Sequence, residues 1–155
     1  MKKPLAAGAL LSLLLALPLP ARGSEIPLPA PEAYRKAVLV FRNMGAIPTY
    51  MDEGLRTIRT DYSLTRLTER EADCGGRFGI PFIKDRKVKT AVAYEVRFED
   101  IDEKRSEMHL KILIDGYVDV YEGESSADGK GGGGKKLSCR STGELEKRFE
   151  EALKR

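Results

Sequence analysis

The residues that decide the fold are VKTAVAYEVRFED (88–100) and, after a short connection, MHLKILIDGYVDV (108–120). Apolar side chains recur at every second position in both stretches, and charged residues fill many of the positions between them. A period of two is typical of a β-strand with one buried face. The charged connection 99–105 has hairpin length, so the two strands are expected to pair antiparallel. Gly116 interrupts the second pattern and predicts a bulge or bend.

Shorter patterns on both sides predict further strands. The stretch 58–64 also alternates, and its expected buried face consists of Ile58, Thr60, Tyr62 and Leu64. The segment 47–51 contains a proline and is expected as an edge strand. A further short strand is expected at 136–139, after the glycine-rich stretch.

Two helices are expected at the ends of the domain. In 31–44, apolar residues recur at steps of three and four, and Gly45 follows where a C-cap glycine belongs. Ser141 and Glu144 have capping-box spacing and predict the start of a C-terminal helix. The fold is therefore predicted as α+β, an antiparallel sheet of four to five strands with an N-terminal and a C-terminal helix packed on one face.

Residues 1–23 have the order of a cleavable secretion signal: two lysines, an apolar run, then small residues. We expect cleavage before Ser24, with a cut after Ala16 as the alternative. Residues 24–30 then form a linker and 31–155 a single domain. Since no cysteine lies near the cut to accept a lipid, we expect a periplasmic or secreted protein without an integral membrane span.

Loss of this segment removes Lys2, Lys3 and Arg22 and lowers the formal charge from +3 to zero. A balanced mature domain offers no electrostatic case for nucleic acid or an anionic membrane as the partner.

The two cysteines, Cys74 and Cys139, are expected to form a structural disulfide, because exported proteins fold under oxidising conditions. A redox pair would normally have Cys-x-x-Cys spacing, and a metal site would need further ligands beside the single histidine. We therefore expect no metal and no cofactor.

No catalytic constellation is recognisable in the sequence, so the protein is expected not to be an enzyme. His109 lies on the polar face of its strand without a visible base or nucleophile. Gly129, Gly134 and Lys135 match part of a phosphate-binding loop, but Lys136 stands where Ser or Thr should bind magnesium. The stretch 125–136 is interpreted as a flexible polar loop.

The long non-periodic segment 69–87 is the candidate binding loop, with Arg77, Phe78 and Phe82 as its candidate residues. The alternative, which we favour, places both aromatics at the edge of the core with the disulfide anchoring the loop.

Two motifs, Ala72-Asp73-Cys74-Gly75 and the Cys-x-Ser-x-Gly-x-Leu-Glu run that begins at Cys139, carry a resemblance. The chain resembles a group of uncharacterised exported proteins of Gram-negative bacteria. Its layout is also similar to helix-grip modules of outer-membrane assembly lipoproteins, from which it differs in lacking the lipidation cysteine. We expect a non-enzymatic protein-interaction or envelope-assembly module, with a small-molecule or lipid carrier as the alternative.

Overall fold

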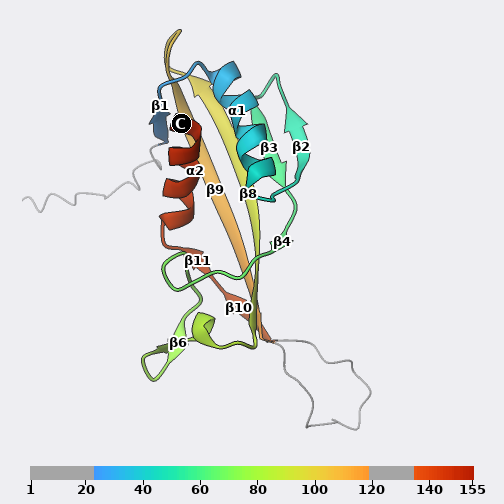
Figure 1. Cartoon of the computed structure of the whole chain (residues 1–155), viewed down its shortest axis with the longest axis vertical. Helices are drawn as coiled ribbons and strands as arrows, with labels where there is room; N and C mark the ends of the chain where they lie inside the picture. Colours follow the sequence, from blue (N-terminus) through green and yellow to red (C-terminus); the bar gives the residue numbers. More distant parts are fainter. Residues whose placement is uncertain (1–22, 119–134) are drawn as a thin grey trace, which may run out of the picture.

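In the computed structural model, which describes residues 23–118 and 135–155, the two alternating stretches form one long hairpin (Figure 1). Strand β8 (Val88–Asp100) pairs antiparallel with β9 (Ser106–Val118), from Val88 opposite Val118 to Asp100 opposite Ser106. The predicted hairpin is therefore confirmed. The predicted signal peptide up to residue 22 and the glycine-rich stretch up to residue 134 lie outside the described residues.

Five shorter strands extend this hairpin into a seven-stranded sheet. The strand order is β1-β9-β8-β3-β2, while β10 also pairs with β9 and β4 also pairs with β8. The bounds of the five are β1 (Ser24–Ile26), β2 (Pro48–Asp52), β3 (Thr57–Thr60), β4 (Ser63–Leu64) and β10 (Lys135–Ser138). The expected edge strand is β2, and part of the expected linker forms β1.

Both helices pack on the same face of the sheet, which confirms the predicted α+β fold. The sheet has seven strands rather than the expected four to five, because β1 and the separate β4 were not predicted. Helix α1 (Ala30–Asn43) lies over β8 and β3, and α2 (Glu144–Lys154) lies beside it over β1 and β9 (Figure 1). Phe41 of α1 joins the layers, because its ring centroid lies 4.7 Å from that of Phe149 and 5.5 Å from that of Tyr94. No helix in the described part of the chain is long and apolar enough to cross a bilayer.

The far end of the long hairpin carries a small lobe that protrudes from the body (Figure 1). It contains two short antiparallel pairs and one turn of 3-10 helix. These are β5 (Ala72–Asp73) with β11 (Arg140–Ser141), β6 (Gly76–Arg77) with β7 (Ile80–Pro81), and η1 (Phe82–Lys84).

The expected continuous strand 58–64 is wrong, because a register shift divides it into β3 and β4. Strand β3 places Thr57 opposite Arg97, and if that register continued, Ser63 would lie opposite Ala91. Ser63 lies opposite Val92 instead, so one extra residue has been inserted. An inserted residue exchanges the two faces of a strand. Tyr62 and Leu64 are therefore exposed rather than buried.

Two local expectations are also corrected. The pairing of β8 with β9 runs through Gly116 without a shift, so this glycine marks no bulge. The capping box is not formed, because α2 begins at Glu144 with Gly143, at φ +96°, as its N-cap. The Ser141 hydroxyl instead donates to Glu146, at 2.5 Å, and accepts the Gly143 N–H.

Candidate functional site

The predicted disulfide between Cys74 and Cys139 is present and anchors the protruding lobe to the sheet. Cys74 follows β5 directly, and Cys139 lies between β10 and β11, with the two Cα atoms 4.0 Å apart. The pairing of β5 with β11 starts directly beside this bridge, with Asp73 opposite Arg140. The bridge therefore joins the segment 69–87 to the chain that enters α2.

Gly116 gives the disulfide room to lie against β9. A Cβ atom at this position would come within 2.6 Å of the Cys139 Sγ and 3.1 Å of the Leu137 Cβ. Any side chain would displace one of these neighbours. The interruption in the apolar pattern of β9 thus reflects packing beneath the disulfide.

A second attachment of the lobe is the ion pair between Glu71 and Arg148 of α2, with oxygen and nitrogen 2.5 Å apart. The Glu71 side chain is 12% exposed and also accepts hydrogen bonds from the amide and hydroxyl of Thr68. Burial acts to raise the pKa of Glu71, but the hydrogen bonds from Thr68 and Arg148 outweigh it and hold the pKa below its ordinary value. Glu71 is therefore a carboxylate at neutral pH.

Beyond the disulfide, β6 and β7 form a hairpin with a two-residue turn at Phe78 and Gly79. Both residues have positive φ, +52° and +78°, as in the type I′ turns that connect short hairpins. Glycine and asparagine are preferred there, and an aromatic residue in this conformation costs on the order of 1–3 kcal/mol. Backbone geometry therefore does not explain the aromatic side chain at position 78.

The hairpin tip is the most exposed apolar surface of the lobe. Phe78 is 89% exposed and Ile80 66%, and the Arg77 guanidinium lies 5.0 Å from the centroid of the Phe78 ring. A shallow hollow of about 570 Å³ lies between the tip and η1. Large exposed apolar side chains gathered in one place mark interaction surfaces in soluble proteins.

The structure divides the three predicted loop residues between two environments. Arg77 and Phe78 lie at the tip, whereas Phe82 is half-buried and packs against the core, where we had expected both aromatics. Ile80 belongs to the tip, and the sequence reasoning missed it. The signal was present as an apolar residue between Gly79 and Pro81, a position with no periodic pattern to bury it.

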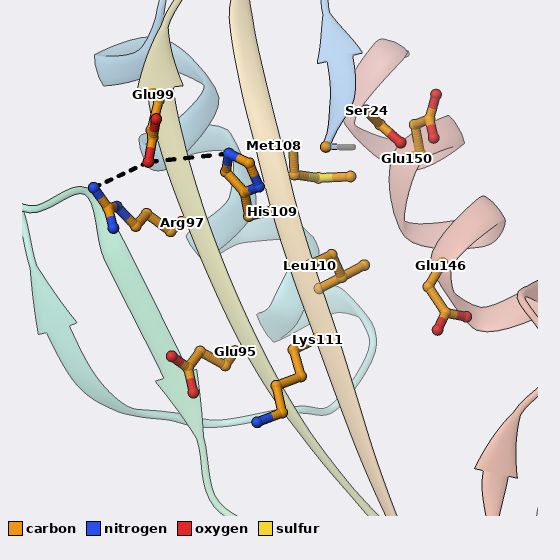
Figure 2. A pocket seen from close by; sticks show the side chains of 11 residues that line it. Ser24, Glu95, Arg97, Glu99, Met108, His109, Leu110, Lys111, Glu146 and Glu150 are labelled. Carbon is orange, nitrogen blue, oxygen red and sulfur yellow. Dashed lines mark ion pairs between the residues drawn. The ribbon is translucent and has the colours of Figure 1, made fainter. Parts of the chain in front are cut away.

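His109 lies apart from the lobe, among charged side chains on the exposed face of the sheet (Figure 2). Its Nε2 atom is 4.0 Å from a Glu99 oxygen and 3.9 Å from a Glu107 oxygen, and Arg97 pairs with Glu99 at 3.0 Å. The Arg97–Glu99 pair is an exposed ion pair, and the His109 Nε2 atom has no hydrogen-bond partner among the described residues. The histidine is therefore not hydrogen-bonded through Nε2 to a nucleophile. Within residues 23–118 and 135–155, no three His, Cys, Asp or Glu side chains gather as metal ligands.

The disulfide-anchored lobe can therefore present its apolar hairpin tip to a partner.

No family model matches the chain, and no curated protein is significantly similar to it.

Proposed function

We propose that the mature chain is a non-enzymatic protein-interaction module of the periplasm or the extracellular space that docks through the hairpin of residues 76–82. The observation that carries the proposal is the exposure of Phe78 and Ile80 at the tip of a disulfide-anchored hairpin. Aromatic anchors held in a fixed conformation are common centres of protein interfaces, because little conformational entropy is lost on binding.

The core supports an interaction module over a carrier of small molecules or lipids. A carrier needs an apolar cavity, and the natural place would be between the helices and the sheet. The centre of that space is filled by Phe41, whose ring contacts those of Tyr94 and Phe149, and all three side chains are buried.

The experiment places a photoreactive amino acid at position 78 of the full precursor, expressed with its own signal. Irradiation of intact cells then links the hairpin tip to whatever lies against it. The matched control carries the same group at position 39, because Leu39 is 57% exposed on α1, an element outside the lobe.

A protein adduct of discrete mass that forms from position 78 and not from position 39 supports the proposal. Adducts with lipid alone, or equal labelling from both positions, contradict it. Lipid labelling would instead identify the tip as a membrane-surface contact.

A further inference from the structure

Strand β9 has a gap in the row of strands along its outer edge. On the side away from β8, β1 pairs with residues 106–108 and β10 with residues 115–118. Within the described residues, no strand pairs with 109–114 on this side. A stretch of this length spans about 20 Å.

The backbone groups that face the gap are those of Leu110 and Ile112. In an antiparallel strand, successive residues direct their N–H and C=O groups to opposite sides. The Ile101 amide donates to the Arg105 carbonyl. The N–H and C=O groups of the odd-numbered residues of β9 therefore point toward β8. The Met108 carbonyl lies beside Gly23 on the β1 side. The N–H and C=O groups of the even-numbered residues therefore point toward the outer edge.

An open hollow of about 630 Å³ wraps around this edge of β9 (Figure 2). One part of it faces α2, and the other part is lined by charged side chains on the exposed face of the sheet, among them Arg97, His109 and Lys111. Leu110 provides an apolar wall on the helix side, and Glu146 and Glu150 of α2 face it. Hydrogen bonds from Lys154 and Ser24 outweigh burial and hold the pKa of Glu150 below its ordinary value. The helix side of the hollow is therefore apolar and carries two carboxylates, of which Glu150 is paired with Lys154.

A second copy of this chain fits the gap poorly. In a second copy, β9 is a continuous strand of 13 residues and would collide with β1 or β10. Strand β2, at the opposite edge of the sheet, contains no basic residue to face the two glutamates.

We infer that residues 109–114 of β9 bind a short extended segment of a partner protein as an added antiparallel strand. Its residues opposite Leu110 and Ile112 lie beside Glu146 and Glu150, so basic side chains fit there. Its residue opposite Lys111 lies on the other face, where an acidic side chain fits. This surface is separate from the hairpin tip, so either site can fail without the other.

The test uses the full mature protein and a synthetic peptide, acetyl-Val-Arg-Glu-Arg-Thr-amide, which places arginine opposite Ile112 and Leu110. One control peptide, Val-Glu-Lys-Glu-Thr, carries the reversed charges. The other keeps the original side chains and has a methyl group on the backbone nitrogen of each arginine. Binding is measured by NMR titration, together with hydrogen exchange of the Leu110 and Ile112 amides.

We expect the parent peptide to slow exchange at Leu110 and Ile112 and both control peptides to bind about tenfold more weakly or worse. The variant Ile112→Pro removes an outward N–H without removing a bond to β8, and it should weaken binding about tenfold. Ile112→Ala keeps that N–H, and its affinity should stay within about threefold of the original.

The inference is overturned if the parent peptide does not bind at millimolar concentration, or if the methylated peptide binds equally well. Protection of the two amides by self-association of the protein would also overturn it. The methylated peptide tests the backbone hydrogen bonds to β9 on the unmodified protein, so the test remains valid even if Ile112→Pro does not fold.

Discussion

Gly116 illustrates how a single residue allows the Cys74–Cys139 disulfide to pack against the sheet. The bridge joins two segments 65 positions apart in sequence, and it can lie on β9 only because position 116 has no side chain. The conformational freedom of glycine is not the reason, since the strand is regular on both sides of it.

The substitution Gly116→Ala should lower the free energy of unfolding by about 1–3 kcal/mol, because the new methyl group overlaps the Cys139 sulfur. Gly54→Ala is the matched control, since the nearest atom there lies at 3.4 Å, and its effect should stay within about 0.5 kcal/mol. Urea unfolding measures both. Equal losses in the two variants would contradict this account of Gly116.

Glu71 should contribute a stability that depends on pH. Its pKa is lower in the folded protein than the ordinary 4.5. The contribution is therefore fully present above 4.5 and is lost as the pH falls below 4.5 and through the lower pKa of the folded state. Glu71→Gln should therefore cost about 1–2 kcal/mol at pH 7, allowing for the exposure of Arg148. The cost should shrink towards pH 3, and an equal cost at both pH values would rule out the ion pair as its source.

Among the elements, those with many periodic residues could be predicted from sequence. The hairpin of β8 and β9 and both helices follow from apolar patterns that repeat over several turns or pleats. The register shift between β3 and β4 could not be predicted, because the alternation in 58–64 continues across it. Strand β1 has only three residues, and its pairing depends on a distant strand.

The free edge of β9 predicts a specific pattern of amide hydrogen exchange in the unbound protein. Lys111 and Leu113 direct their N–H groups to β8, whereas Leu110 and Ile112 direct theirs to the gap. The amides of Leu110 and Ile112 should exchange at least about tenfold faster than those of their two neighbours. Uniformly slow exchange across 110–113 would mean that another part of the chain covers this edge.

At the scale of the whole molecule, the disulfide connects the candidate site to the core. The sequence predicted the bridge, and it offered Arg77 and Phe78 as candidate binding residues of the loop. The favoured expectation, that Phe78 lies at the edge of the core, is wrong, because its side chain is 89% exposed. The sequence could not separate Phe78 from Phe82, because both are aromatic residues in one non-periodic segment. Phe78 is exposed because it lies in the two-residue turn, whereas Phe82 lies in η1, which packs against β8.

Reduction of the disulfide should destabilise the protein by up to about 4 kcal/mol, the chain-entropy value for a loop of this length. Thermal unfolding with and without a reductant measures the loss. Proteolysis of the reduced protein should produce cuts in the segment 69–87 that the oxidised protein does not show, because that segment loses its main covalent attachment. Identical cleavage of this segment in both forms would show that the bridge is not what holds the lobe.

The most direct test of the proposed function compares two double variants in cells. Phe78→Ala with Ile80→Ala removes the hairpin tip, and Leu39→Ala with Leu55→Ala removes two exposed apolar side chains outside the lobe. Both pairs should leave the melting temperature nearly unchanged, since none of the four side chains is buried. We predict that chemical crosslinking of the tip variant recovers its protein complex at least about tenfold less than the control. Equal recovery of the complex from both variants would contradict docking through the hairpin.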